Sequence, residues 1–203
     1  MPIIRPFRSL PPIARKEYNY EFVDYMWYNG LFKEEEVETI RSLWKPDQTI
    51  DAKVNTGDQD IAKETLRKSE IMFIKPGGNE WIYDRLSNAC IQANTGRYKF
   101  DITGFQTELQ LASYGIKHFF DWHMDFGSGD LSNRKLSITV QLSDPDEYEG
   151  GELQFMINQT VFTATKEKGT AIIFPSFALH RVTPITKGCR KSIVGWISGP
   201  PYR

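Results

Sequence analysis

The segment DWHMDFGSGD (residues 121–130) contains a histidine and an aspartate whose spacing suits a metal site. Side chains at positions i and i+2 of a strand point to the same face. His123 and Asp125 can therefore offer an imidazole nitrogen and a carboxylate oxygen to one ion, and His180 is the candidate for a third ligand. Two histidines and one carboxylate on one side of a metal leave coordination positions open, as in non-haem Fe(II) sites. Since an isolated H-x-D histidine is as often a packed residue, these three residues alone leave both interpretations open.

Arg190 adds a second feature that favours the metal site. It follows His180 on the next predicted strand, and Ser192 lies two residues further along on the same face. The planar guanidinium binds a carboxylate through two hydrogen bonds, and a serine hydroxyl can add another donor. The alternative is a solvated charge at a strand edge, like Lys187 and Lys191. Because the arginine follows a candidate metal triad, the combination favours a site that binds a carboxylate beside a metal.

Length and composition predict one folded domain. The chain has 203 residues, of which 40% are hydrophobic and 13% aromatic, enough to form a core. Its 25 basic and 26 acidic residues nearly cancel, and the sequence pI is about 6.3. The chain therefore lacks the basic surplus of proteins that grip phosphate backbones, and no nucleic-acid partner is expected. The oligomeric state is not indicated by the sequence.

Several features predict a cytoplasmic protein. Cys90 and Cys189 are too few for a disulfide framework, so we expect two free thiols. The first 16 residues are broken by prolines and lack the apolar region of a signal peptide. No apolar run reaches the length of about 18 residues needed to span a membrane, so no membrane association is expected.

The first half of the chain carries helical patterns. Residues 1–16 are expected to form an extended arm, and residues 17–203 a single domain. Segment 31–46 predicts a helix, with acidic residues at its start and a proline after its end. Segment 78–96 predicts a second helix with Asn79 as N-cap and Gly96 as its stop. The polar run 51–70 predicts a surface loop.

From about residue 104 to 200 the hydrophobic period changes to two, which is typical of strands. The strand candidates are TELQLASY, KLSITVQLSD, GELQFMI, TVFTATKEKGTAIIFP, LHRVTPIT and CRKSIVGWIS. Helices followed by many short antiparallel strands predict the α+β class, with the strands in a double-sheet jelly roll.

The chain resembles the prolyl 4-hydroxylase family of Fe(II)/2-oxoglutarate dioxygenases, in particular the microbial and phage PKHD-type hydroxylases. The resemblance covers roughly residues 28–200 and is most specific between 105 and 198. It is carried by YGIKHFFDWHMDFG, KLSITVQLSDPDEYEGGELQF and KGTAIIFPSFALHRVTPITKGCRKSIVGWI, and more weakly by RKSEIMFI and EWIYDRLSNACIQAN. It implies a double-stranded β-helix, which is a jelly roll of the cupin type, with flanking helices.

The resemblance also implies a set of site residues. The iron ligands would be His123, Asp125 and His180, and Arg190 would pair with the distal carboxylate of 2-oxoglutarate. Tyr114 matches a tyrosine that contacts this cosubstrate in relatives, although an ordinary buried strand aromatic would look the same. Gln141 stands where some relatives carry a tyrosine for the same carboxylate, and its amide could still donate. Ser192 would add a donor beside Arg190.

The activity implied by the resemblance is hydroxylation of a prolyl residue in a peptide or protein, with decarboxylation of 2-oxoglutarate to succinate and CO2. The implied cofactors are Fe(II) and 2-oxoglutarate, with L-ascorbate as a further candidate. A free amino acid or other small molecule is an alternative substrate. A jelly-roll binding module without turnover is an alternative from a different class, which the intact triad and Arg190 disfavour. A Zn(II) hydrolase is a third alternative, but no general base is evident beside the triad.

Overall fold

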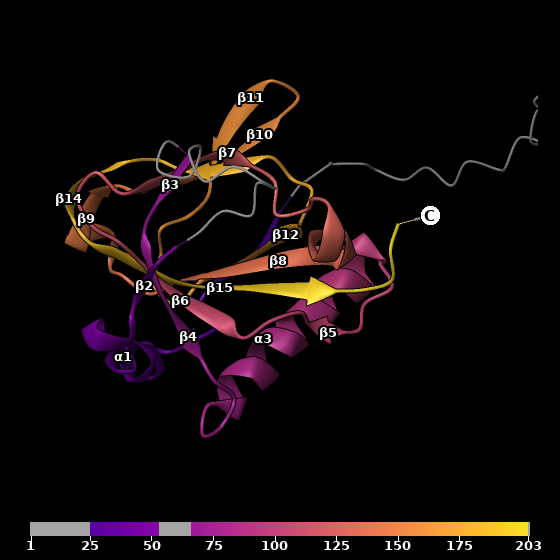
Figure 1. Cartoon of the computed structure of the whole chain (residues 1–203), viewed down its shortest axis with the longest axis horizontal. Helices are drawn as coiled ribbons and strands as arrows, with labels where there is room; N and C mark the ends of the chain where they lie inside the picture. Colours follow the sequence, from indigo (N-terminus) through magenta and orange to yellow (C-terminus); the bar gives the residue numbers. More distant parts are fainter. Residues whose placement is uncertain (1–24, 53–65, 203) are drawn as a thin grey trace, which may run out of the picture.

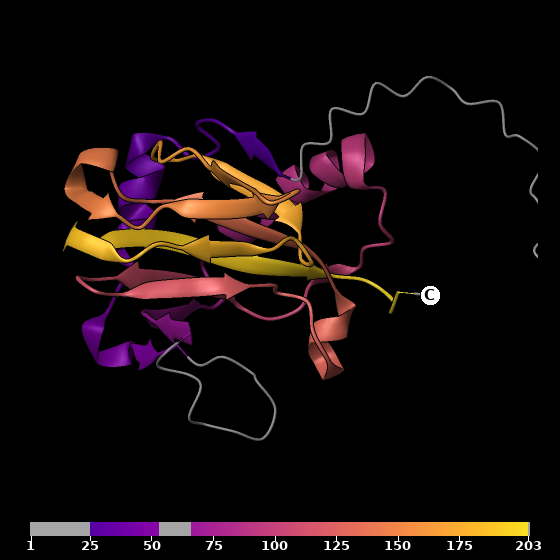
Figure 2. The same cartoon turned by 90° about the horizontal axis from the view of Figure 1, so that it is seen from above.

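The computed structural model describes residues 25–52 and 66–202. The predicted arm at 1–16 and most of the predicted loop at 51–70 lie outside these residues. Two β-sheets pack face to face, and two helices cover the outer side of the larger sheet (Figures 1 and 2). The predicted α+β class and the double-sheet jelly roll are therefore confirmed.

The larger sheet provides the scaffold to which both helices and the smaller sheet are attached. Its strands all pair antiparallel. In spatial order they are β1 (Met26–Tyr28), β12 (Ala171–Pro175), β8 (Arg134–Gln141), β15 (Arg190–Ser198), β6 (Leu109–Tyr114), β4 (Glu70–Ile74) and β2 (Ile50–Asp51), and β5 (Gly104–Phe105) pairs with β15.

The smaller sheet lies across from the larger one. Its strands, again antiparallel, are β11 (Thr160–Thr163), β10 (Leu153–Ile157), β13 (His180–Val182), β7 (Phe119–His123) and β3 (Arg67–Lys68). A two-stranded ribbon of β9 (Tyr148–Gly150) and β14 (Ile185–Gly188) lies at one end of the molecule (Figure 1).

Helices α1 (Glu34–Ser42) and α3 (Glu80–Ala93) form where the sequence has an apolar stripe of helical period. The buried residues of α3 are Ile82, Leu86, Ala89, Cys90 and Ala93, the stripe expected from the sequence. They pack on apolar side chains of β4, β6, β8, β12 and β15, which forms the first of two cores. Short helical turns occur at Pro46–Gln48, Asn94–Tyr98, Gly129–Asn133 and Pro145–Glu147.

The two faces of the larger sheet differ in character, and this difference creates the site. On β8, Leu136, Ile138 and Val140 belong to the core under the helices. The alternate side chains of this strand are Ser137, Thr139 and Gln141, which are buried as well. Because alternate residues of a strand point to opposite faces, the face between the two sheets is polar at this strand.

Some predicted boundaries were wrong. The second helix ends at Ala93 and continues as a π-helical turn through Gly96, and the left-handed residue that follows is Lys99. Asn79 occupies the N-cap position without a capping hydrogen bond, since its amide donates to the Lys75 carbonyl instead. The described ends of the predicted loop at 51–70 are strand residues of β2, β3 and β4.

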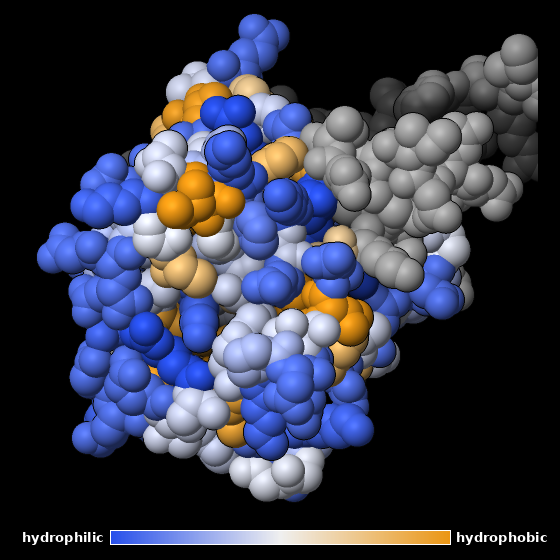
Figure 3. Space-filling model, turned by 60° about the vertical axis from the view of Figure 1, so that its left-hand side comes forward, coloured by the Kyte–Doolittle hydropathy of each residue, from blue (hydrophilic) through white to orange (hydrophobic). Residues whose placement is uncertain are grey.

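The surface and the cysteines are consistent with a folded core that keeps its apolar residues inside. Cys90 is fully buried and Cys189 partly buried, and both are free thiols. None of the helices in the described part of the chain has the length and apolar character of a membrane-crossing segment. On the face shown in Figure 3, hydrophobic side chains form small patches separated by hydrophilic ones.

The helix core predicts the cost of a cavity. Leu86 of α3 is completely buried, whereas Ile91 on the same helix is 51% exposed. We expect Leu86→Ala to lower the free energy of unfolding by about 2–5 kcal/mol and Ile91→Ala to change it by less than about 0.5 kcal/mol. Urea unfolding followed by circular dichroism measures both. Equal effects of the two substitutions would contradict the packing of α3 on the sheet.

Candidate metal centre

The two candidate histidines come from adjacent strands of the smaller sheet. His123 ends β7 and His180 begins β13, and the two are direct cross-strand partners. Asp125 follows β7 immediately, in the turn that leads toward β8. The backbone amide of Phe126 donates to the carbonyl of Ser176, at 2.9 Å, so the turn after His123 is tied to the loop before His180. Strand pairing therefore brings together residues that are distant in the sequence.

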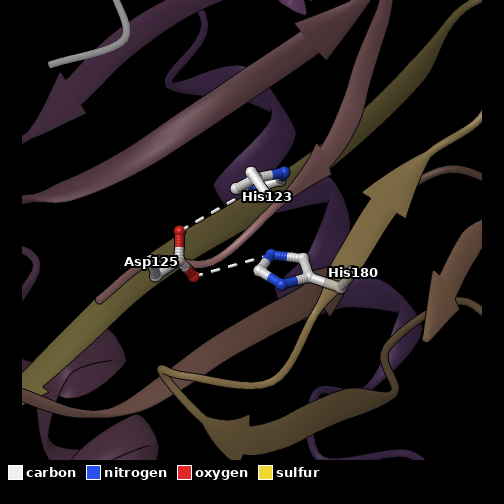
Figure 4. Close-up of side chains that lie close together, drawn as sticks. All are labelled: His123, Asp125 and His180. Atoms are coloured by element: carbon white, nitrogen blue, oxygen red, sulfur yellow. Dashed lines mark ion pairs between the residues drawn. The ribbon is translucent and has the colours of Figure 1, made fainter. Parts of the chain in front are cut away.

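The three side chains meet as the sequence spacing predicted. Nε2 of His123 lies 3.7 Å from Oδ1 of Asp125, and Nε2 of His180 lies 3.6 Å from Oδ2 (Figure 4). All three ligand atoms lie within 4.8 Å of one another. Ligands that are each about 2.1 Å from a shared ion and separated by roughly 90–120° would be about 3.0–3.6 Å apart. The arrangement fits a divalent ion between them after a small contraction.

Hydrogen bonds orient both imidazoles toward this point. Nδ1 of His123 lies 2.7 Å from the carbonyl oxygen of Asp121, and Nδ1 of His180 lies 2.8 Å from that of Ala178. A carbonyl can only accept, so each Nδ1 carries the proton and donates it. The lone pair of each ring is then on Nε2, the atom that faces Asp125. A metal-ligating histidine typically has such a partner on its other nitrogen.

Asp125 is held as a carboxylate in a buried position. It is 8% exposed and accepts a hydrogen bond from the Ser137 hydroxyl at 2.7 Å. Burial opposes its ionisation, but the two histidines and the Ser137 hydroxyl outweigh burial and keep the pKa of Asp125 below its ordinary value. Ser137 belongs to β8 of the larger sheet, so this bond fixes the carboxylate from the opposite layer.

His123 is neutral at physiological pH. Burial, and next the neighbouring His180, lower the pKa of His123 to about 3. The Phe120 ring stacks on the His123 ring with a centroid distance of 3.3 Å and an interplanar angle of 11°. A neutral imidazole with a free lone pair is the form that ligates a metal.

A pocket between the two sheets connects the triad to Arg190. Its walls are Arg67, Tyr114, Phe120, His123, Asp125, Thr139, Leu153, Phe174, His180, Val182, Arg190, Ser192, Val194 and Trp196. Of the sequence-predicted site residues, Tyr114 and Ser192 therefore line the same pocket as the triad and Arg190. Gln141 does not line it.

Arg190 is the most unusual residue of this pocket. It is 1% exposed, and among the described residues no carboxylate forms an ion pair with it. Its guanidinium donates to Oε1 of Gln141 at 2.9 Å and lies 5.6 Å from the centre of the Tyr114 ring. Gln141 in turn donates through its amide to the Thr165 carbonyl. Gln141 thus holds the arginine from behind.

Other buried donors in the pocket wall also lack partners. Nε of Arg190, the hydroxyl of Ser192 and the indole nitrogen of Trp196 are buried and make no hydrogen bond with the described residues. A buried polar group without a partner costs roughly 1–3 kcal/mol. Three such donors in one pocket indicate an acceptor-rich ligand, and a molecule with carboxylates satisfies them.

Sequence reasoning missed three residues that shape this site. Ser137 and Phe120 contact the ligand triad, and Arg67 lines the pocket from β3. Ser137 sits in a strand pattern whose alternate residues are Ser, Thr and Gln. That polar alternation within a buried strand is a signal for a site, whereas nothing local marks Phe120 or Arg67.

Comparison with known proteins gives relatives for the strand region. The profile of the 2OG-Fe(II) oxygenase superfamily matches residues 109–198. A PKHD-type hydroxylase of Synechococcus sp. (strain CC9902) is 42% identical over 78 residues, which are 38% of this chain and 35% of that protein. A PKHD-type hydroxylase of Pseudomonas fluorescens (strain Pf-5) is 28% identical over 175 residues, covering 82% of this chain and 75% of that protein. The alignment with the first of these relatives thus spans about a third of its length.

Solved structures share the fold. A prolyl-4-hydroxylase of Pseudomonas putida superposes with a TM-score of 0.70 at 18% identity, covering 87% of this chain and 93% of that one. A prolyl hydroxylase of Trichoplax adhaerens, in complex with a peptide fragment of hypoxia inducible factor, gives 0.71 at 15% identity, covering 87% of this chain and 84% of that one. At these identities the similarity establishes the fold.

The triad geometry predicts how metal affinity depends on each group. Removing a group that orients a ligand typically costs about 10–100-fold in metal affinity. We therefore expect Ser137→Ala to weaken Mn(II) binding about tenfold and Asp125→Ala to weaken it further. Asp130→Ala, in the same loop region but outside the triad, serves as control. Titration followed by electron paramagnetic resonance measures free Mn(II), and unchanged affinity in Asp125→Ala would remove this carboxylate from the centre.

Proposed function

Because residues 109–198 belong to the 2OG-Fe(II) oxygenase superfamily, we propose that the chain is an Fe(II)- and 2-oxoglutarate-dependent hydroxylase. The observation that carries this proposal is the buried Arg190 without a carboxylate partner among the described residues, in the same pocket as the triad. A buried charge is expensive unless it is paired. An anionic cosubstrate bound beside the metal would supply the missing partner.

In this proposal His123, Asp125 and His180 hold Fe(II) through Nε2, a carboxylate oxygen and Nε2. Two histidines and one carboxylate with open positions are the ligand set of non-haem Fe(II) oxygenases. When bound, Fe(II) and 2-oxoglutarate together supply the oxidising chemistry. Ser137 and the carbonyls of Asp121 and Ala178 keep the three ligands oriented.

Arg190 would pair with the distal carboxylate of 2-oxoglutarate. Its position is fixed by Gln141, and its Nε together with the hydroxyl of Ser192 provides donors that are free. Tyr114 is the direct cross-strand partner of Arg190, and its ring forms a wall of the pocket. These contacts would orient the cosubstrate so that its other end reaches the metal.

The remaining walls would exclude water from the reacting atoms. Leu153, Phe174, Val182 and Val194 surround the triad with apolar surface. The Phe174 ring packs edge-on against His180 at 4.7 Å between ring centres. A dry, rigid pocket protects reactive species from side reactions and keeps the ligand rings in place.

The proposed substrate is a prolyl residue in a peptide or protein. The proposal is supported by the names of the similar proteins, PKHD-type hydroxylases and prolyl hydroxylases, one of which was solved with a peptide. A free amino acid is the alternative substrate. L-ascorbate remains a proposed accessory reductant. Full turnover should release one succinate for each hydroxylated product.

The experiment that tests the function measures succinate. The protein is loaded anaerobically with Fe(II), then given 2-oxoglutarate and air with prolyl peptides, with free proline or with neither, and each set is repeated without ascorbate. Stimulation of succinate release by the prolyl peptides supports the proposal. If free proline stimulates and peptides do not, the small-molecule alternative is correct. If 2-oxoglutarate is neither bound nor consumed, the chain is a binding module.

Arg190 predicts a specific loss of cosubstrate binding. Truncating one member of a buried charge pair typically costs about 2–5 kcal/mol, so Arg190→Ala should raise the Kd for 2-oxoglutarate by roughly 30-fold or more. Arg190→Lys keeps the charge but loses the planar fork, so its Kd should be intermediate. Mn(II) affinity should change little in either variant.

The matched control for Arg190 is Lys187→Ala. Lys187 is an exposed cation on β14, near in sequence, that pairs with Glu149 at 3.1 Å. Calorimetric titration of each Mn(II)-loaded variant with 2-oxoglutarate gives the affinities. An Arg190→Ala variant that is folded and binds 2-oxoglutarate as tightly as the Lys187→Ala control would exclude Arg190 as the anchor.

A further inference from the structure

A second arginine, Arg67, lines the pocket from the opposite sheet. Arg67 lies on β3, where it is the cross-strand partner of Phe120, whereas Arg190 lies on β15 of the larger sheet. The guanidinium carbon of Arg67 stands 4.7 Å from the centre of the Phe120 ring, and that ring stacks on His123. Arg67 is therefore one aromatic ring away from a metal ligand.

The contacts of Arg67 leave its terminal nitrogens available. Its Nε donates to the hydroxyl of Ser69 at 2.9 Å, which fixes the direction of the planar group. Within residues 25–52 and 66–202, neither terminal nitrogen forms an ion pair or hydrogen bond with a carboxylate. Unlike Arg190, which is 1% exposed, Arg67 is partly exposed, so it stands toward the mouth of the pocket.

The charge balance of the pocket shows what is missing. The charged side chains of its wall are Arg67, Arg190 and Asp125, and the histidines are neutral as ligands. Fe(II) adds two positive charges and 2-oxoglutarate removes two. One positive charge then remains without a counter-ion, in a pocket whose other walls are mainly apolar. Since Arg190 is the more deeply buried, it is Arg67 whose charge remains available to the primary substrate.

We propose that Arg67 recognises a carboxylate on the primary substrate. This inference rests on the proposed function and narrows its substrate class. A guanidinium whose Nε is already fixed offers its terminal nitrogens as a preoriented fork, which suits a carboxylate better than a neutral carbonyl. The carboxylate can come from an acidic side chain beside the hydroxylated residue or from the carboxyl group of a terminal residue or free amino acid. A neutral stretch inside a peptide would leave Arg67 unpaired.

Matched pairs of probes separate these sources. The first pair is a blocked peptide with Pro-Glu and the same peptide with Pro-Gln. The second is N-acetyl-Gly-Pro as the free acid and as the amide, and the third is proline and prolinamide. Binding is measured by calorimetry to the full chain loaded with Mn(II) and N-oxalylglycine, an inert mimic of 2-oxoglutarate. In at least one pair, wild-type protein should bind the carboxylate member about tenfold or more tightly than the neutral member.

Variants of two adjacent residues test whether Arg67 is responsible. Arg67→Met should abolish the preference within the pair, Arg67→Lys should retain part of it, and both should bind N-oxalylglycine like the wild type. Lys68→Met removes the neighbouring exposed charge of β3 and should keep the full preference. If Arg67 served only to pack on Phe120, the Met variant would keep the preference as well.

Each other result has a definite meaning. Equal binding of both members of all three pairs by wild-type protein, or binding of neither, would overturn the proposal for Arg67, as would a preference that persists in Arg67→Met. If wild-type protein fails to bind N-oxalylglycine and 2-oxoglutarate, it is the proposed function that fails. The two failures are therefore distinguishable in the same titrations.

Discussion

The buried positive charge of Arg190 is the constraint on which the organisation of the site depends. A guanidinium that is 1% exposed must be compensated, yet its described partners are a neutral amide oxygen and an aromatic face. Removing a charge from water costs several kcal/mol unless it is paired. The chain accepts this cost in the free protein because the anion that offsets it is the cosubstrate. Selectivity for a 2-oxo acid with a second carboxylate follows from this arrangement.

The larger sheet makes such a site affordable by separating stability from chemistry. Its outer face packs against α1 and α3 through a continuous apolar core. Its inner face can then carry Ser137, Thr139 and Ser192 without loss of the fold. Ser137 shows the coupling between the layers, since a strand of one sheet fixes the carboxylate that follows a strand of the other. The metal ligands are thus braced by both sheets.

The sequence predicted the parts of the site that depend on local spacing. His123, Asp125 and His180 meet because strand alternation and cross-strand pairing act as expected, and Arg190 faces the same space as Ser192. The helix stripe of α3 was equally readable. The role of Gln141 behind Arg190, and the positions of Phe120 and Arg67, depend on which strands become neighbours. The sequence does not encode strand neighbours in local patterns, so these three residues required the structure.

The central claim is that one pocket holds a metal on the triad and a 2-oxo acid on Arg190 at the same time. The most direct measurement is the visible absorption of the anaerobic protein with Fe(II) and 2-oxoglutarate added in turn. Chelation of the metal by the 2-oxo acid should give a weak charge-transfer band that requires both additions. A protein that binds Fe(II) with the affinity of an intact triad and shows no band at saturating 2-oxoglutarate would contradict the account.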